Sequence, residues 1–432
     1  MPRGKHRFKH VRRDVLKGIL FIAVALAIKL AIEHTTFGKH LAVMDYNLLQ
    51  TQLSKEQVPF TIIDVSDLAQ KDFVVSGEIV RATPRDPLKE MIKALADQRP
   101  KAIAIDIDFS PDQGRYILAS DPEFFEFCQN VIKETGVPII LGIKRTIGDP
   151  AADWLGQERY QDLAASILVP RDTRRMASLI KVEEETAPED RERRITTVPT
   201  MSKRLAEIWG QQPDRPAHAL LLKLGLVERF SEQHLAYGVS PEDFLVDYGS
   251  LESIETIKAT NSEVLHDQHD RIFGKLVLIG DATLGKASDV FSVPGREQPS
   301  PGIFLHACGA YTLITAPLYE LTHTGRVVID VLLSAVILVM LILVGLFYRT
   351  TKAREKATHE LRGILTLVTV VTAIVVGAVF VRVTRIMWDD FFLALILLVF
   401  HPSIEERLEG LWMTVRKLFA WKSRSRAKKV AS

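Results

Sequence analysis

The sequence has little of what several common functional sites require. It contains only two cysteines, Cys128 and Cys308, in 432 residues, and no group of His and Cys has the spacing of a zinc site. No G-x-S-x-G motif of a serine hydrolase occurs, and His306 has no companion nucleophile. The formal net charge is +2, which gives no general attraction to nucleic acid. We therefore expect no zinc site, no nucleic-acid partner and no catalytic residue of these kinds.

A phosphate-binding loop is nearly present but lacks one residue. Residues 276–289 read LVLIGDATLGKASD, and from Gly280 the spacing is G-x-x-x-x-G-K-A. A nucleotide loop requires Ser or Thr after the lysine, because that hydroxyl ligates Mg²⁺, and Ala287 stands there instead. We therefore expect no nucleotide and no other cofactor, and we interpret the segment as a core strand and turn.

Long apolar runs, by contrast, occur four times and predict membrane spans. The second and third reach roughly 20 residues with almost no charge, which is the length that crosses a bilayer. The first fits an uncleaved anchor or a cleaved signal peptide, and we favour the anchor because no A-x-A cleavage site follows before His34. The fourth is short and taken alone also fits a buried helix. The four runs are residues 16–32, 327–348, 364–383 and 386–400.

Basic residues predict the orientation of these spans. Lysine and arginine crowd residues 3–13, 349–362 and 416–429. With four spans all three segments face one compartment, which the positive-inside rule identifies as the cytoplasm. We expect a multi-pass protein of the cell inner (plasma) membrane, with its large domain outside the cytoplasm. The expected order is a basic cytoplasmic N-terminus (1–14), an anchor (15–33), an extracytoplasmic domain (34–325), a span (326–348), a cytoplasmic loop (349–362), two spans (363–383 and 386–401) and a cytoplasmic tail (402–432).

The two cysteines leave two alternatives open. A domain outside the cytoplasm lies in a compartment that permits disulfides, so Cys128 and Cys308 can form a bridge. Two buried free thiols are the simpler interpretation, because free cysteine behaves as a small apolar residue.

Within 34–325 the pattern predicts an α/β domain. Short, continuously apolar runs are typical of strands buried on both faces of a sheet. Helical patterns at 86–98 and 121–136 lie between the first three runs, and strands that alternate with helices favour a mostly parallel sheet with helices on both faces. Residues 144–240 are less regular, and we interpret them as an insertion around this sheet. The predicted strands are FTIIDV (60–65), KAIAIDIDF (101–109), VPIILGI (137–143) and KLVLIGD (275–281).

Aspartates follow several of these strands and predict a ligand site. In an open parallel sheet ligands bind at the carboxyl ends of the strands, and carboxylates that converge there need a counter-charge, for which Arg85 and Lys286 are candidates. Alternatively each aspartate caps a turn or a helix. A third reading takes Asp106 and Asp108 as a D-x-D phosphatase motif, which needs Mg²⁺ and a phosphate-holding lysine as well; we expect no enzyme. The aspartates are Asp64, Asp106, Asp108 and Asp281.

The C-terminal tail carries an amphipathic pattern. Its apolar residues recur at helical spacing, with basic residues off that face, which is typical of a helix that lies on a membrane surface or docks on a partner. These apolar residues are Leu408, Leu411, Trp412, Val415, Leu418 and Phe419.

Several of these motifs together resemble the second type of CHASE domain, an extracytoplasmic sensory domain. The resemblance extends over roughly 40–400, and its most specific parts are the D-x-D-F strand and the block from GKLVLIGDA to PGIFLHA. One departure is Ala82-Thr83 before Pro84-Arg85, where the family often has a Trp-Pro-Trp-like element. The matching residues are Asp64, Pro84, Arg85, Asp106, Asp108, Phe109, Asp121, Asp289, Pro301, Gly302 and His306.

The resemblance implies a receptor-like function. We expect a sensor that binds a ligand, whose identity the resemblance does not indicate. The expected ligand-binding residues are Asp64, Arg85, Asp106, Asp108 and Asp281. Asp289 and His306 are expected to have coupling or structural roles. Family members typically continue into a cytoplasmic output domain, and the basic tail here does not resemble one, so we expect a separate signalling partner in the cytoplasm or membrane. The alternative is a structural or assembly component of an inner-membrane complex. The sequence leaves homo-oligomerisation open.

Overall fold

A computed structural model describes most of the central part of the chain. The residues it describes are 24, 27, 29, 31–32, 35–50, 53, 59–68, 70–75, 78–110, 118–144, 158–170, 172–183, 195–210, 214–235, 238–284, 289–315, 317–329, 331–332 and 379–387.

The chain divides into two units by its internal contacts. One, here called the globular unit, comprises Asn47–Glu320 and Thr384–Met387; the other comprises Met1–Tyr46, Leu321–Val383 and Trp388–Ser432. The four expected spans lie mostly outside the described residues, as do the basic N-terminus, the loop 349–362 and the tail. Among the residues that are described, no helix combines the length and the apolar character needed to cross a bilayer. The spans therefore stay predictions.

A six-stranded parallel sheet forms the centre of the globular unit. Its strand order is β13-β1-β14-β4-β5-β6, and each neighbouring pair is parallel. All five residues of β1 and of β14 are buried, as expected of strands covered on both faces. The four predicted strands are confirmed, and two further strands extend the sheet at its edges. The bounds are β1 Phe60–Asp64, β4 Ala102–Ile105, β5 Ile139–Ile143, β6 Ala164–Ser166, β13 Glu255–Lys258 and β14 Leu276–Gly280.

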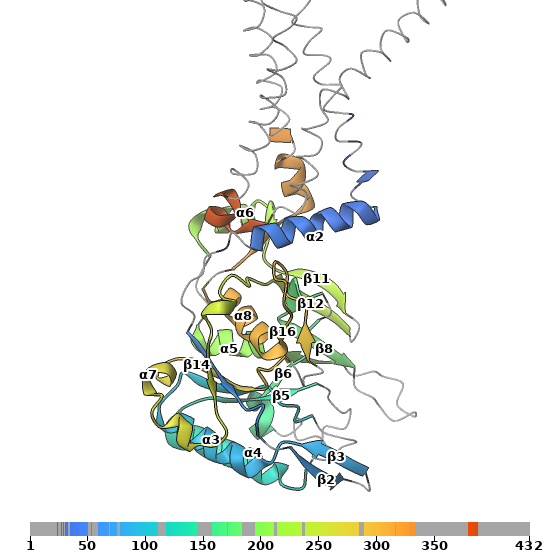
Figure 1. Cartoon of the computed structure of the whole chain (residues 1–432). Helices are drawn as coiled ribbons and strands as arrows, with labels where there is room; N and C mark the ends of the chain where they lie inside the picture. Colours follow the sequence, from blue (N-terminus) through green and yellow to red (C-terminus); the bar gives the residue numbers. More distant parts are fainter. Residues whose placement is uncertain are drawn as a thin grey trace, which may run out of the picture. The chain divides into compact units, whose positions relative to one another are not determined.

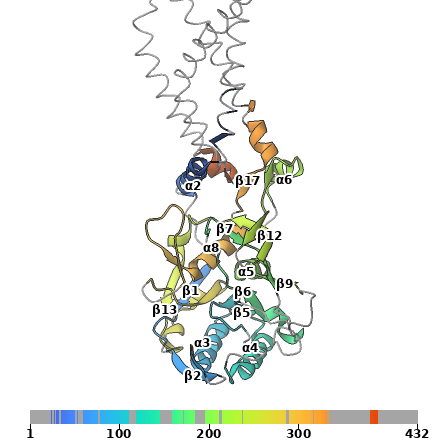
Figure 2. The same cartoon turned by 90° about the vertical axis from the view of Figure 1, so that its right-hand side faces the viewer.

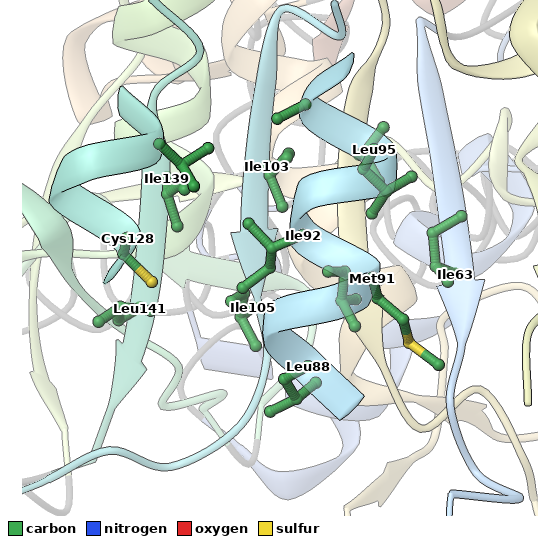
Figure 3. Close-up of a cluster of buried hydrophobic side chains, with 14 of the residues drawn as sticks. Ile63, Leu88, Met91, Ile92, Leu95, Ile103, Ile105, Cys128, Ile139 and Leu141 are labelled. Carbon is green, nitrogen blue, oxygen red and sulfur yellow. The ribbon is translucent and has the colours of Figure 1, made fainter. Parts of the chain in front are cut away.

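Two long helices cover one face of this sheet. They are α3 (Arg85–Asp97) and α4 (Asp121–Thr135), shown below the sheet in Figure 1. Leu88, Ile92 and Leu95 of α3 are fully buried. In Figure 3 α3 lies over Ile103 and Ile105 of β4, whereas Cys128 of α4 lies beside Ile139 and Leu141 of β5. Gly136 ends α4 with φ 73°, a left-handed conformation that glycine adopts readily. The predicted helices are confirmed within a few residues.

The opposite face is covered by α5 (Met201–Trp209) and α8 (Gly302–Ile314), so the prediction of helices on both faces is also confirmed (Figures 1 and 2). Strand residues alternate between the two cores: Ile103 faces α3 and α4, and Ala104 faces α5 and α8. Cys128 belongs to the first core and Cys308 to the second. Because the sheet separates them, both are buried free thiols, as the simpler interpretation had it.

Short strands outside the central sheet, most of them paired antiparallel, surround it and account for much of the irregular middle of the sequence. They form a hairpin β2-β3, a sheet β11-β12-β7, the pairs β8-β9 and β15-β16, and a sheet β10-β17-β18. Their bounds are β2 Lys71–Val75, β3 Glu78–Ala82, β7 Arg175–Ala177, β8 Leu179–Glu183, β9 Ile195–Pro199, β10 Val227–Glu228, β11 Ser231–Leu235, β12 Gly238–Leu245, β15 Val290–Phe291, β16 Ser300–Pro301, β17 Tyr319–Leu321 and β18 Ile386–Met387. The remaining elements are α2 Thr36–Gln50, η2 Glu158–Leu163, α6 Pro216–Lys223, η3 Leu251–Ser253, η4 Glu263–Leu265 and α7 His269–Ile272.

The connections place a topological switch point beside β14. After β1, β4, β5 and β13 the next helical segment packs in the core of α3 and α4, which also contains Tyr160 of η2 and Ile272 of α7. After β14 the chain instead enters α8 on the other face. Loops that leave neighbouring strands toward opposite faces open a crevice at the carboxyl ends, where ligands of such sheets bind.

Candidate functional site

Three of the strand-end aspartates hold turns. In each, the carboxylate accepts hydrogen bonds from the backbone N–H and the hydroxyl of the residue two positions later, which is an Asx turn. Asp64 also accepts from Ala282 N at 3.1 Å and so ties the end of β1 to the end of β14. The turn-capping alternative therefore describes these residues, and the sequence signal is Asp-x-Ser/Thr. The pairs are Asp64 with Ser66, Asp108 with Ser110, and Asp281 with Thr283, with N–H to carboxylate distances of 3.0, 2.9 and 2.8 Å.

Arg85 lies in the core and pairs with a residue outside the strand ends. Its Nε is 2.6 Å from Asp121 Oδ1, and both side chains are almost completely buried. The guanidinium lies 4.4 Å from the centre of the Phe109 ring, and Asp121 also accepts from Leu118 N at 2.8 Å. The expected pairing of Arg85 with the strand-end aspartates is therefore wrong, because Arg85 forms its ion pair with Asp121 at the start of α4 instead. Lys286, the other candidate, lies outside the described residues.

Asp106 and Asp289 differ from the turn aspartates. Within the described residues neither carboxylate makes a hydrogen bond or an ion pair. Asp106 directly follows β4, and its backbone N donates to Ile279 O of β14 at 2.8 Å. Asp289 lies against the start of α8: its backbone O accepts from Gly302 N at 3.0 Å, and a β-carbon at position 302 would be only 2.6 Å from Asp289 Oδ2. Glycine at 302 thus permits this close approach.

His306 is one turn further along α8. It lies four positions after Gly302, so the two share a helix face. The imidazole is completely buried, and among the described residues neither ring nitrogen reaches a partner with normal hydrogen-bond geometry. The pKa of His306 is lowered to about 4, chiefly by burial; a backbone hydrogen bond at Ile167 opposes this effect and the charge of Lys144 adds to it. His306 is therefore neutral at physiological pH.

The field of Lys144 reaches all three of these groups. Burial raises the pKa of Asp106 to about 7, with repulsion from Asp289 adding to it and Lys144 opposing it. Burial also raises the pKa of Asp289, again against Lys144. Lys144 directly follows β5. It is not among the site residues predicted from the sequence, although a basic residue at the end of a buried strand is a signal for one. We call Asp106, Lys144, Asp289 and His306 the edge cluster.

The close packing of three elements holds the edge cluster together. A β-carbon at Gly280, the last residue of β14, would lie 3.1 Å from Asp106 Cβ and 2.9 Å from Ile303 Cδ1. The ends of β14 and β4 and the first turn of α8 therefore meet at this point, which is the switch point of the sheet. No set of three His, Cys, Asp or Glu side chains suited to a metal ion occurs in the described part of the chain. The cluster offers mainly hydrogen-bond acceptors.

A second region of interest, here called the β17–β18 junction, has no recognisable pattern in the sequence. Ile386 and Met387, which the sequence placed at the start of a membrane span, form β18 and pair in parallel with Tyr319 and Glu320 of β17. That boundary of the expected span was wrong, because an apolar two-residue strand looks like the beginning of an apolar helix. Arg385, with φ 55°, accepts from Tyr319 N through its backbone O at 3.0 Å.

Buried polar contacts fix β18 to the globular unit. The guanidinium of Arg385 forms an ion pair with Asp247, whose side chain is completely buried. Thr384 O lies 2.5 Å from His218 Nε2, and the His218 ring stacks on Tyr319 with ring centres 4.3 Å apart. A segment of only four residues is thus held by an ion pair, a strand pairing and a histidine contact.

Helix α8 connects the edge cluster with this junction. Near its C-terminal end Thr312 Oγ1 accepts from Asp247 N at 2.8 Å and donates to Cys308 O at 2.8 Å. Arg229 donates to Leu313 O at 3.0 Å. At about 1.5 Å per residue the 13-residue helix is roughly 20 Å long. One rigid, buried element therefore begins beside Asp289 and ends beside the partner of Arg385.

A polar pocket of about 500 Å³ opens elsewhere in the globular unit. Its charged groups are largely satisfied, since Arg296 pairs with Glu252 at 2.6 Å and donates to Tyr248 O at 3.3 Å. The side chain of Gln50 also has partners, because it donates to Val246 O and accepts from Tyr248 N. In this pocket Arg296, Glu252 and Gln50 thus already have partners within the chain.

Comparison with known families agrees with this architecture. The family model of the CHASE2 domain matches residues 19–347, which include the whole sheet, the edge cluster and α8. The chain belongs to the CHASE2 domain family, a family of sensory domains. No curated protein and no solved structure matches the chain.

Proposed function

We propose that the chain is a membrane-anchored extracytoplasmic sensor. It binds a ligand at the edge cluster and passes the signal through its membrane segments to a separate partner. The observation that carries the proposal is the β17–β18 junction, because it ties the sensory domain to chain that lies between two expected spans.

The junction supports the four-span arrangement. β17 directly precedes the second expected span, and β18 lies between the third and the fourth. Two strands that pair must lie on the same side of a membrane, which requires an even number of crossings between them. Spans 326–348 and 363–383 supply two crossings, and the basic segments then share the opposite, cytoplasmic side.

Transmission follows from the position of α8. A ligand shifts a conformational equilibrium only if it binds one state more tightly than the other. The edge cluster can supply that difference, because within the described residues the carboxylates of Asp106 and Asp289 have no hydrogen-bond or ion-pair partner, and they lie beside the first turn of α8. Movement of a buried helix as a rigid element changes the contacts at its far end, here those of Thr312 with Asp247 and so of Arg385.

The proposal includes a signalling partner in the cytoplasm. A tail helix of residues 408–419 provides a surface on which such a protein can dock.

The proposal also includes no catalytic activity. A phosphatase of the D-x-D type would need Asp106 and Asp108 to face the substrate together, whereas the carboxylate of Asp108 accepts a hydrogen bond from Ser110 N at 2.9 Å. Assay of the purified chain with a phosphomonoester, with and without Mg²⁺, should give no turnover above background; Mg²⁺-dependent turnover lost in Asp106→Asn would establish an enzyme.

Labelling of single cysteines tests the anchoring and orientation. Lys223 is exposed at the end of α6, and Arg354 lies in the expected cytoplasmic loop. In right-side-out membrane vesicles an impermeant maleimide should modify Lys223→Cys at once and Arg354→Cys only after the membrane is opened. Cys128 and Cys308 are buried, so the parent chain is the control for background labelling. Equal labelling of both variants, or the reverse order, would rule out the proposed topology.

The alternative of an assembly component is favoured by one feature. The hairpin β2-β3 exposes Val74 and Ile79 to 78% and 75%, and these residues are paired across the hairpin. Exposed paired apolar side chains suit a protein contact. If the chain is mainly an assembly component, Val74→Ser with Ile79→Ser should reduce co-purification of its partner from membranes, and Asp106→Asn should not.

A further inference from the structure

We propose that helix α6 lies on the phospholipid surface of the membrane, with the apolar side chains of its exposed face between the headgroups and the upper acyl chains. The inference rests on the proposed membrane anchoring and adds a direct contact between the sensory domain and the bilayer. It is carried by an exposed apolar helix face on an element that contacts Thr384, the residue after an expected span.

The exposed face of α6 is apolar. Leu220 and Leu224 are 57% and 58% exposed, and Pro216 and Ala217 in the first turn are exposed as well. Positions 216, 217, 220 and 224 recur at the spacing of three and four residues that places side chains on one side of a helix. His218 points elsewhere and is buried. Helices on the surface of a water-soluble domain usually expose polar residues, so this face suits an interface with lipid better than water.

Contacts with the β17–β18 junction place α6 at the expected edge of the membrane. His218 Nε2 lies 2.5 Å from Thr384 O, and Thr384 directly follows the expected span 363–383. Consecutive α-carbons are only about 3.8 Å apart, so Thr384 lies at the expected boundary. The His218 ring also stacks on Tyr319 of β17, which ends a few residues before the expected span 326–348. Both segments that His218 contacts therefore adjoin expected spans.

The chain that follows α6 joins the same junction. Gly225 turns the chain after α6 with φ 65°, a left-handed conformation that glycine adopts readily. Val227 and Glu228 then form β10, which belongs to one three-stranded sheet with β17 and β18. Helix α6 is thus fixed to the junction near its start through His218 and after its end through β10. A lipid surface that holds α6 also acts on the junction.

Charge complementarity favours a phospholipid surface as the occupant. Arg215 is the N-cap residue of α6 and Lys223 is its last residue, and both are exposed. Long basic side chains keep their charge at the headgroups while their stems cover apolar surface. Residues 215–227 contain no acidic residue, and the carboxylate of the preceding Asp214 accepts from Tyr319 Oη at 2.5 Å. Leucines flanked by basic residues are typical of a helix that lies in the plane of the membrane surface.

Fluorescence of a probe on α6 in lipid vesicles tests the proposal. Ala217→Cys carries a nitrobenzoxadiazole probe, because this position lies on the exposed face and leaves both leucines in place. Cys128 and Cys308 are buried and stay unlabelled. The full-length chain is reconstituted in vesicles of phosphatidylcholine and phosphatidylglycerol, with and without lipid that carries a nitroxide on its upper acyl chain. The apolar face of such a helix enters the boundary between headgroups and acyl chains by about 5–10 Å, so the nitroxide should quench at least half of the emission.

Val74→Cys with the same probe is the matched control. Val74 is an apolar residue of β2 with 78% exposure, and β2 lies at the opposite end of the globular unit from α6 (Figures 1 and 2). Quenching there should be at least five-fold weaker than at position 217. Leu220→Gln with Leu224→Gln should reduce the quenching at position 217 at least two-fold. Both leucines are exposed, so the double variant should remain folded, which thermal unfolding measures.

Two results would overturn the proposal. One is quenching at position 217 that is no stronger than at position 74. The other is emission at position 217 that ignores the nitroxide and instead changes with the ratio of protein to lipid, because a second copy of the chain would then cover α6. Maleimide labelling of Lys223→Cys and Arg354→Cys decides the membrane anchoring separately. A failed lipid contact is therefore distinguishable from a failed topology.

Discussion

At the scale of single residues, the aspartates at the strand ends separate into two kinds. The carboxylates of Asp64, Asp108 and Asp281 accept hydrogen bonds within the turn that follows each of them, and these bonds fix the direction in which each loop leaves its strand. Asp106 and Asp289 do not, and this difference makes them the ligand candidates. The distinction follows from one feature of the sequence: the first three have Ser or Thr two positions later, whereas Asp106 is followed by Ile107-Asp108 and Asp289 by Val290-Phe291.

Asp106→Asn should stabilise the protein at alkaline pH. The folded-state pKa of Asp106 is about 7, well above the ordinary value of 3.8 for an unfolded chain. The folded state therefore binds the proton more tightly, and stability falls as the pH rises from about 4 through 7. At pH 8 the variant should be more stable by on the order of 1–3 kcal/mol, after allowance for the partial exposure of Asp106, and at pH 4 by almost nothing.

Chemical denaturation of the full-length chain and the variant across pH 4 to 8 measures this effect. Asp108→Asn is the control, because it loses turn hydrogen bonds and should be less stable than the parent at pH 8. A difference between Asp106→Asn and the parent that does not change with pH would contradict the assignment of a raised pKa.

At the scale of elements, the sequence predicted the sheet and its covering helices but not the pieces that make the site. β1 and β14 were recognisable because every residue in them is buried, which leaves a continuous apolar run. The small strand pairs were not, since most of their strands have only two to five residues, too few to show such a run. β18 could not be found at all, because its two residues directly precede an apolar stretch and only the distant β17 makes them a strand.

The resemblance in sequence and the structure assign different roles to Arg85. It was grouped with the aspartates because they share a family pattern, but sequence does not give the direction of a side chain at a helix start. In the structure Arg85 faces Phe109 and Asp121, between α3 and α4. Its charge stabilises the packing of two helices and not the edge of the sheet.

Arg385→Ala should destabilise the junction strongly. The variant leaves the carboxylate of Asp247 buried without its cation, and removal of one member of a buried pair costs about 3–5 kcal/mol. Asp247→Asn combined with Arg385→Met removes both charges and should recover at least half of that loss. Unfolding free energies of the parent, Arg385→Met, Asp247→Asn and the double variant form the cycle that isolates the pair.

A coupling energy near zero in that cycle would contradict the role given to the pair. Lys258→Ala provides a comparison, because Lys258 pairs with Asp67 at the surface at 2.8 Å, where an ion pair is worth only about 0–1 kcal/mol. If Arg385→Ala costs no more than this surface change, β18 is not fixed by Asp247.

At the scale of the whole molecule, the short β17–β18 pair holds the segment between two expected spans against the sensory domain. The CHASE2 domain family identifies the domain, the edge cluster lies at the switch point of its sheet, and α8 runs from there to Asp247. The membrane spans stay predictions from the sequence, based on their length, their lack of charge and their basic flanks. The structure adds that residues 384–387, between two of the expected spans, belong to the same unit as the sensory sheet.

Cross-linking of β17 to β18 in native membranes tests this central claim most directly. Glu320 and Met387 are register partners in neighbouring strands, about 5 Å apart as such partners are, which suits a disulfide. Glu320→Cys with Met387→Cys should form an intramolecular disulfide under mild oxidation, detected as a linked peptide by mass spectrometry. The control pair Lys223→Cys with Met387→Cys should not. Absence of the 320–387 link in chains that are folded and inserted would contradict the account, because the sensory domain would then have no hold on the segment between the spans.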